Sequence, residues 1–204
     1  MLIQSVGLEN SPVIFDVGCT ICHPEHTDFT GECLDLFNDC KIFGFEPTKW
    51  HSYEEKYKDD NRVTLIKEVL SDVSGSVPFY TFVGNTGISS LFNREVFSTC
   101  DDLVETVVDC NTLDGLCATL NIDKIDYLKI DAEGAEYKIL IGAERMLRER
   151  KIINVQFEFH ESCSVVDAGF SFLELEEWLN EFGLFFRERK GDDYLFTMKG
   201  NDNE

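Results

Sequence analysis

Three carboxylates lie close together in the stretch Lys129-Ile-Asp-Ala-Glu-Gly-Ala-Glu136. They follow an apolar run, residues 125–130, that predicts a buried strand, and α/β proteins place ligand chemistry at the ends of such strands. A carboxylate there can take a proton from a substrate or bind a hard cation. Asp131 and Glu133 are therefore candidate catalytic residues. The alternative is a helix cap at Asp131, with Glu133 and Glu136 in the first helical turn.

A second candidate group lies on residues 152–160, which alternate between apolar and polar types as a strand does. The alternation places Glu158 and His160 on one face. His160 is a candidate general base because imidazole titrates nearest the operating pH. Glu158 is a candidate substrate contact and, with Asp131, a candidate ligand for Mg²⁺ or Mn²⁺, which would acidify a substrate hydroxyl. The alternative is an edge strand or a polar, solvent-facing strand surface.

Six further residues of a suitable type follow the first three predicted strands. They are Asp16, Gly18, Thr20, Glu46, Ser71 and Asp72. Glu46 stands where an acidic side chain can accept hydrogen bonds from ribose hydroxyls, and Ser71 and Asp72 stand where an adenine edge would lie. The pyrophosphate-binding pattern GxGxxG is absent, because only Gly18 is present in that loop. The set predicts a site for a nucleoside without phosphates.

The elements that must position these residues alternate along the chain. Predicted strands cover residues 13–17, 42–45, 63–70, 77–83, 104–108, 125–130 and 152–160, and predicted helices cover residues 31–37, 49–58, 112–120 and a single stretch ending near 147. Thr112 is a good cap for the helix that runs to about residue 120. A capping box at Ser171 and Glu174 starts the last helix, and a hairpin through Gly191 ends the chain. We expect an α/β, doubly wound, mostly parallel sheet with a C-terminal antiparallel hairpin, in one domain of residues 1–204.

The composition and net charge of the chain argue against some classes of binding partner. The chain has 204 residues, 43% of them apolar, which is enough to bury a full core. A net charge of -21 at pH 7 repels nucleic-acid phosphates and anionic lipids. The N-terminus lacks a basic flank, and no segment approaches the ~20 apolar residues of a membrane span. We expect a soluble, cytoplasmic protein with no nucleic-acid or membrane partner; the sequence leaves its oligomeric state open.

The eight cysteines are expected to be free thiols rather than a disulfide framework. Cys33, Cys40, Cys110 and Cys117 stand among apolar residues and are predicted to pack as small hydrophobes. Cys19 and Cys22, followed by His23 and His26, could form half of a zinc site, but no second CxxC accompanies them.

Several motifs occur in the order found in FkbM-type methyltransferases, which the chain resembles over roughly residues 13–160. They are VIFDVGCTI (13–21), GFEP (44–47), LSD (70–72), SSL (89–91), TLD (112–114) and KIDAEGAE (129–136), with Leu140 and Gly142-Ala143 after them. The resemblance implies a class I methyltransferase (Rossmann-like) fold with a seven-stranded sheet. It also implies transfer of a methyl group from S-adenosyl-L-methionine to a hydroxyl of a small acceptor, with a sugar or glycan terminus preferred.

The resemblance also implies roles for particular residues. Asp16, Gly18 and Thr20 would line the methionine moiety, Glu46 the ribose and Asp72 the adenine. Independently of the resemblance, Ser89 and Ser90 stand in a polar loop, from which they could contact the acceptor or the cofactor, or could be turn residues.

The first loop departs from the family pattern. Cys19, Thr20 and Cys22 replace the usual Ala, Asn and second Gly. Residue 22 thus has a Cβ where the backbone usually comes close to the ligand. One alternative is therefore a non-catalytic nucleoside-binding or interaction module with the same fold, and a weaker one is a nicotinamide oxidoreductase.

Overall fold

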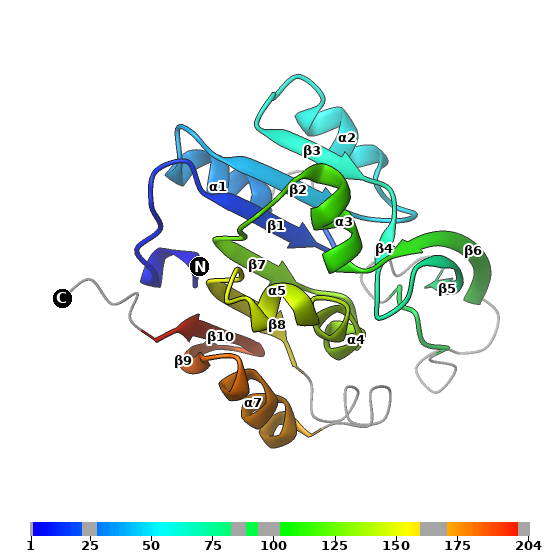
Figure 1. Ribbon diagram of the computed structural model, residues 1–204. Helices are drawn as coiled ribbons and strands as arrows, with labels where there is room; N and C mark the ends of the chain where they lie inside the picture. The colour runs from blue at the N-terminus through cyan, green and yellow to red at the C-terminus, as the bar shows by residue number, and fades with distance from the viewer. Residues whose placement is uncertain (1, 22–27, 83–88, 94–102, 160–170, 200–204) are drawn as a thin grey trace.

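The computed structural model describes residues 2–21, 28–82, 89–93, 103–159 and 171–199 (Figure 1). Its centre is a seven-stranded sheet of order β3-β2-β1-β7-β8-β10-β9. These strands are β1 (Val13–Val17), β2 (Lys41–Phe45), β3 (Val63–Ile66), β7 (Tyr127–Ile130), β8 (Asn154–Glu158), β9 (Leu184–Lys190) and β10 (Asp193–Met198). The first five in this order are parallel, and β10 runs antiparallel to β8 and β9. The predicted parallel sheet and closing hairpin are confirmed.

Helices cover both faces of this sheet because successive side chains of each strand point to opposite sides (Figure 1). Phe15 and Val17 of β1 pack with the helices on one face, whereas Ile14 belongs to a separate cluster with Cys33 on the other. The first face carries α3 (Leu113–Leu120), α4 (Glu136–Ile141), α5 (Glu144–Arg148) and α7 (Phe172–Glu181). The second carries η1 (Ile3–Ser5), α1 (Phe29–Leu36) and α2 (His51–Tyr57). The sheet is doubly wound, as expected.

Local capping explains where several helices begin. The Thr112 side chain accepts a hydrogen bond from Gly115 N at the start of α3, and Ser171 with Glu174 forms a reciprocal capping box at the start of α7. Both caps were expected from the sequence. Asp28 caps α1 by accepting from Gly31 N. Each side chain satisfies a backbone N–H that has no partner inside the helix.

The prediction of one strand over residues 63–70 is wrong. The charged pair Lys67-Glu68 separates β3 from β4 (Val69–Leu70), and β4 joins a different, three-stranded sheet of order β4-β6-β5. The other members are β5 (Gly75–Phe82) and β6 (Leu103–Asn111), which pair antiparallel. Both strands were expected, but their separation into a second sheet was not. Strand pairing is a long-range property that the local pattern does not contain.

The single helix expected up to residue 147 is also divided. Helix α4 ends at Ile141, with Gly142 as its C-cap, and α5 begins at Glu144. At Gly142 the backbone passes so close to another segment that an added Cβ would lie 2.1 Å from Ser71 O. The apolar face itself is confirmed, since all five of its members are buried. They are Ile139, Leu140, Ala143, Met146 and Leu147.

The alternative of a solvent-facing polar surface on β8 is wrong. Strand β8 lies between β7 and β10, and both Asn154 and Gln156 are buried. Gln156 accepts a hydrogen bond from the Tyr127 hydroxyl at 2.6 Å and donates one to Asp193 at 2.8 Å. Hydrogen bonding thus compensates the buried amide.

The cysteines predicted to pack as hydrophobes do so. Cys33, Cys40, Cys110 and Cys117 are buried free thiols.

Among the helices of the described residues, none combines the length and the apolar character needed to cross a membrane.

Candidate functional site

A cavity of about 330 Å³ opens beyond the carboxyl ends of β1, β2 and β7. This is the edge of a parallel sheet where ligands bind, and the volume is within the range of small-molecule sites. Apolar side chains of the second sheet and of α4 form one wall, including Leu70, Phe79 and Ile139. Seven of the residues predicted for the site line it. They are Gly18, Thr20, Glu46, Ser89, Asp131, Glu133 and Glu158.

Glu46 is fixed at one end of the cavity by the turn that follows β2. Its Oε1 accepts hydrogen bonds from the backbone N–H groups of Thr48 at 3.0 Å and Lys49 at 2.8 Å. Its Oε2 accepts one from the Thr20 hydroxyl at 3.1 Å. Lys49 Nζ in turn donates to Ser89 Oγ at 2.6 Å. The carboxylate is therefore held in one orientation, with lone pairs left on Oε2 for a ligand.

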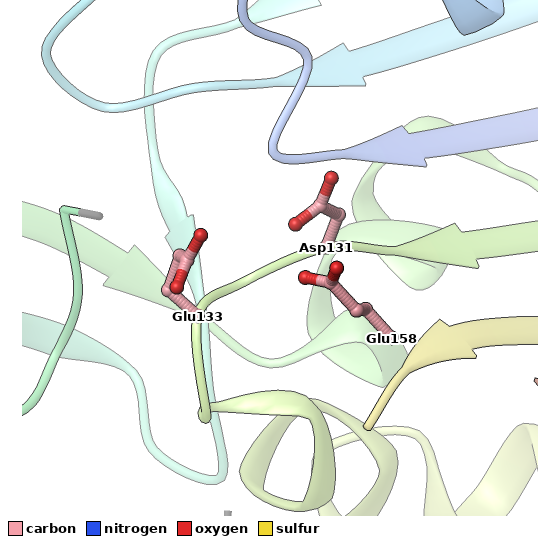
Figure 2. Close-up of side chains that lie close together, drawn as sticks. All are labelled: Asp131, Glu133 and Glu158. Carbon is pink, nitrogen blue, oxygen red and sulfur yellow. The ribbon is translucent and has the colours of Figure 1, made fainter. Parts of the chain in front are cut away.

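Three carboxylates meet at the other end of the cavity (Figure 2). Asp131 follows β7, Glu158 ends β8, and Glu133 lies on the turn after β7. One carboxylate oxygen from each lies within 4.8 Å of the others. All three side chains are partly exposed to the cavity. An all-oxygen set of this kind suits Mg²⁺ or Mn²⁺, and it equally suits proton acceptance.

The turn that carries these carboxylates is unusual in its backbone. Glu133 has φ 52° and Gly134 has φ 96°, both in the left-handed region. Two side chains hold it through three hydrogen bonds: the buried Glu136 Oε1 accepts from Ala132 N at 2.9 Å and Gly134 N at 3.2 Å, and Ser90 Oγ donates to Glu133 O at 2.8 Å. Burial raises the pKa of Glu136 to about 7. The last glutamate of KIDAEGAE therefore shapes the turn rather than lining the cavity.

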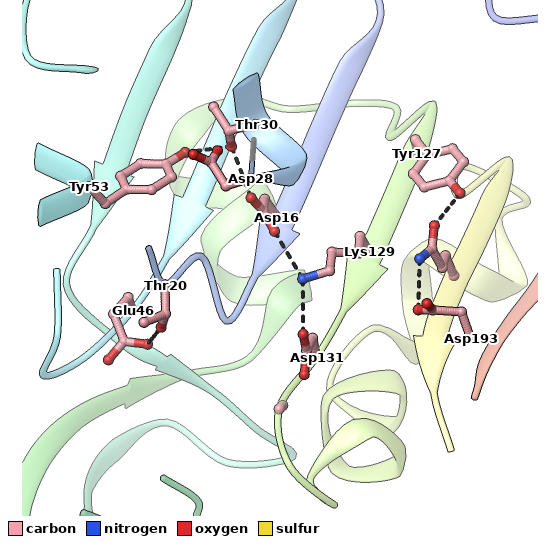
Figure 3. Close-up of polar contacts among 12 residues, drawn as sticks. Asp16, Thr20, Asp28, Thr30, Glu46, Tyr53, Tyr127, Lys129, Asp131 and Asp193 are labelled. Carbon is pink, nitrogen blue, oxygen red and sulfur yellow. Dashed lines mark hydrogen bonds and ion pairs between the residues drawn. The ribbon is translucent and has the colours of Figure 1, made fainter. Parts of the chain in front are cut away.

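Asp131 does not cap a helix. Helix α4 begins at Glu136, its N-cap is Ala135, and no side chain caps it. The alternative of Asp131 as N-cap with Glu133 and Glu136 in the first helical turn is therefore wrong for Asp131 and Glu133, because the turn with positive φ values intervenes. It is confirmed for Glu136, which lies in the first turn of α4. Asp131 instead contacts Lys129 Nζ, 3.3 Å from its Oδ2 (Figure 3).

Four predicted site residues do not line the cavity. Asp16 is buried behind it, beside Thr30 and Lys129. Ser71 is buried and donates to Asp72, which pairs with Lys138 on α4 at 3.3 Å. Ser90 contacts the turn at Glu133. The roles predicted for these residues in direct ligand binding stay predictions.

Two of the predictions concern residues outside the described part of the chain. His160 is the predicted base, and Cys22, His23 and His26 belong to the zinc alternative. Cys19 is described: it is a buried free thiol whose pKa is well above its usual value, through burial and the neighbouring Asp16 and Glu46. A thiol held protonated in this way is a poor zinc ligand.

Sequence reasoning missed Lys129, Lys49 and Asp28, all of which line the cavity. The signal for Lys129 was present, because it is the one charged residue in the otherwise apolar strand β7. Lys49 and Asp28 carry no comparable signal, since charged residues after strands and before helices are common.

The charge of the cavity lining suits a cationic ligand. Among the described residues, six acidic side chains and two lysines line it; they are Asp28, Glu46, Glu68, Asp131, Glu133, Glu158, Lys49 and Lys129. The sulfonium of S-adenosylmethionine is cationic, its ribose needs acceptors such as Glu46, and its adenine suits the apolar wall. The donor set and the charge therefore fit the expected cofactor.

Comparison with known proteins found similarity in sequence and in fold. A sequence model described as the methyltransferase FkbM domain matches residues 20–186. No curated protein matches the chain significantly. A solved methyltransferase FkbM from Methylobacillus flagellatus KT is similar with a TM-score of 0.56 and 16% identity, covering 92% of this chain and 43% of that one. At this identity the likeness shows the fold, and the chain spans less than half the length of that protein.

Proposed function

The chain belongs to the FkbM methyltransferase family, and from this premise we propose that it transfers the methyl group of S-adenosyl-L-methionine to a hydroxyl of a small acceptor. A sugar or glycan terminus is the preferred acceptor class. The observation that carries the proposal is the cavity that Glu46 shares with the carboxylates of Asp131, Glu133 and Glu158. One end suits a nucleoside and the other suits the removal of a proton.

The chain's own residues must orient the acceptor, exclude water and remove one proton, because methyl transfer is an in-line displacement. When bound, the cofactor would supply an electrophilic methyl group, whose bond to sulfur would break as the acceptor oxygen bonds to the methyl carbon. Asp131 accepts the hydroxyl proton in this proposal, and Glu133 and Glu158 accept hydrogen bonds from neighbouring hydroxyls. Three carboxylates at one end of the cavity suit a neutral polyol better than an anionic acceptor.

Metal-assisted deprotonation is the second form of this mechanism. Asp131 and Glu158, with Glu133 beside them, would hold Mg²⁺ or Mn²⁺, and the ion would lower the pKa of the acceptor hydroxyl. In a third form His160 takes the proton. Addition of metal separates the first form from the second, and substitution of His160 tests the third.

The proposal is tested by isothermal calorimetry with S-adenosylhomocysteine, with and without Mg²⁺ or Mn²⁺, followed by transfer of a labelled methyl group to a panel of sugars. Micromolar binding and product formation are expected. Binding without transfer to any acceptor would favour the non-catalytic module. Binding of NAD(P) in place of S-adenosylhomocysteine would favour the oxidoreductase.

Substitution of Asp131 by Asn tests the role given to its carboxylate. We expect turnover to fall at least ~100-fold, because general-base catalysis contributes about this much, with little change in S-adenosylhomocysteine affinity. Asp123, which is exposed and pairs with Lys151, provides the control D123N, for which turnover should stay unchanged. Equal activity of D131N and wild type would move the chemistry towards His160.

A further inference from the structure

Lys129 is a buried ammonium group between two carboxylates, and the sheet register puts it there. Asp16 of β1 and Lys129 of β7 are direct register partners on adjacent parallel strands. Their side chains point to the α1 face, because Phe15 and Leu128, their neighbours in sequence, pack into the core of the opposite face. Only 3% of the Asp16 side chain and 13% of the Lys129 side chain are exposed. Both charges are therefore largely removed from water.

The contacts of Lys129 extend in two directions (Figure 3). Its Nζ lies 3.4 Å from Asp16 Oδ1 and 3.3 Å from Asp131 Oδ2, and 5.8 Å from the centroid of the Phe29 ring. Burial disfavours the charged form, but the carboxylates of Asp131 and Asp16 outweigh it and raise the pKa of Lys129 above its usual value. Lys129 is therefore an ammonium ion throughout the neutral range.

Asp16 is also hydrogen-bonded through the oxygen that does not face Lys129. Thr30 on α1 donates to Asp16 Oδ2 at 2.9 Å, and the Thr30 and Tyr53 hydroxyls lie 2.8 Å apart. Asp16 Oδ1 has no hydrogen bond of good geometry, so the ammonium compensates it by charge. The network runs from α2 through α1 and β1 to β7 (Figure 3).

Asp131 receives much less support. Its side chain is 41% exposed, and within the described residues no side chain other than Lys129 donates a hydrogen bond to its carboxylate. An aspartate with one contact has several rotamers available in a cavity of this size. The ammonium, which the buried network fixes, is the group that can select one of them.

We propose that Lys129 is a positioning residue that holds the Asp131 carboxylate in the orientation used for methyl transfer. Its relevance to catalysis rests on the proposed function, whereas the positioning is a property of the folded chain. Lys129 acts through Asp131 and exchanges no proton with the acceptor. A misplacement of about 1 Å in a reacting group can cost roughly 100-fold in rate, so a fixed neighbour of this kind has a measurable effect.

The test compares D16N with the double variant D16N/K129M. Lys129→Met alone would leave Asp16 buried without a compensating charge, which is strongly destabilising and could prevent folding. In the double variant the side chain at position 16 is a neutral amide whose oxygen can still accept from Thr30, and the net charge equals that of wild type. Lys124→Met is the control, because Lys124 is half-exposed and pairs with Asp126 at the opposite end of β7.

Crystal structures of these variants measure the positioning without any use of activity. We expect the Asp131 carboxylate to occupy one position in wild type, D16N and K124M, and to be displaced or divided between conformers in D16N/K129M. An Asp131 side chain that keeps its position in the double variant would overturn the proposal.

Kinetics of the same variants measure the consequence. For D16N/K129M we expect kcat to fall roughly 10- to 100-fold relative to D16N, with KM and the affinity for S-adenosylhomocysteine within about threefold. A purely structural role for Lys129 predicts instead that the double variant, once folded, is as active as D16N, and that result would also overturn the proposal. If Asp131 is displaced in D16N/K129M but the wild-type protein has no transferase activity, the proposed function is rejected, whereas the positioning of Asp131 by Lys129 stands.

Discussion

At the scale of single residues, the site depends on carboxylates whose surroundings give them different tasks. Glu46 is hydrogen-bonded at both oxygens and presents a fixed acceptor. Asp131, at the other end of the cavity, contacts an ammonium and faces the space for a ligand. Glu136 is buried below the turn and accepts two backbone hydrogen bonds. Position in the fold, rather than residue type, distinguishes these three side chains.

Glu46→Gln tests the ribose contact. The Gln oxygen can still accept from Thr48 N and Lys49 N, so the turn is kept, but the group facing Thr20 and the ligand becomes a donor. We expect the affinity for S-adenosylhomocysteine, measured by calorimetry, to fall at least ~10-fold, the effect of losing a charge-assisted hydrogen bond. Glu54→Gln, at an exposed position on α2 paired with Lys67, should bind as wild type does. Unchanged affinity of E46Q would remove Glu46 from the cofactor site.

Glu136 makes the free energy of unfolding depend on pH. Burial raises its pKa from 4.5 to about 7, so the folded state favours the protonated form. This stabilisation is complete below about pH 4.5 and is lost as the pH rises through about 7. Glu136→Gln imitates the protonated form. As the pH rises from about 5 to about 8, we expect the free energy of unfolding of wild type to fall by up to about 3 kcal/mol relative to that of E136Q.

Urea denaturation at both pH values measures this difference. Glu144→Gln, at a half-exposed position on α5, is the control and should follow wild type at each pH. A difference between E136Q and wild type that does not change with pH would show that Glu136 is ionised in the folded protein at both values.

At the scale of elements, the cavity depends on how closely the loop after β1 approaches β7. Gly18 N donates to Phe45 O at 3.0 Å, and Asp131 N donates to Val17 O at 3.0 Å. Gly18 has φ 81°, and a Cβ there would lie 1.9 Å from Asp131 O. The glycine therefore permits both the left-handed backbone and the close contact that brings the predicted cofactor loop against Asp131.

Gly18→Ala should destabilise the protein by more than about 2 kcal/mol, because it combines backbone strain with a steric clash. Gly191→Ala separates these effects. Gly191 also has a positive φ, 65°, but nothing lies within 4 Å of the place that an added Cβ would take. We expect G191A to lower the free energy of unfolding, measured by urea denaturation, by about 1 kcal/mol. An equal decrease in the free energy of unfolding for G18A and G191A would show that the backbone around Asp131 O moves to accommodate the added Cβ without a further loss of stability.

At the scale of the whole molecule, charge is the dominant property. The chain has 39 acidic and 18 basic residues, so acidic side chains outnumber basic ones by more than two to one. Exposed ion pairs contribute about 0–1 kcal/mol each, and repulsion within a chain of net charge -21 opposes the compact state. Added salt should therefore weaken the repulsion between like charges of the chain more than it weakens the attraction within ion pairs.

An increase of ionic strength from about 20 mM to about 300 mM is expected to raise Tm by several degrees, as measured by differential scanning calorimetry. Choline chloride should act as NaCl does, because the effect is general screening. A Tm that falls with salt would mean that ion pairs outweigh the repulsion. A rise with NaCl but not with choline would indicate binding of small cations instead.

The sequence by itself determined the local elements and the class of the site. Apolar runs predicted β1 and β7, alternation of apolar and polar residues predicted β8, and capping residues predicted the starts of α3 and α7. The order of strands and helices predicted a doubly wound sheet, whose ligands bind at the carboxyl ends of the strands. Six of the seven predicted residues that line the cavity follow from this rule, whereas Ser89 was expected from its polar loop. All of these features depend on neighbours a few positions away, which the sequence displays directly.

Only the tertiary structure decided which distant residues meet. It paired Asp16 with Lys129, moved β4 into a second sheet, buried Asn154 and Gln156, and ended α4 where Gly142 meets Ser71. Each outcome depends on strand register or on close packing between segments far apart in the chain. Such contacts are selected by the free energy of the whole fold, and a one-residue change in register would reverse the face of every side chain.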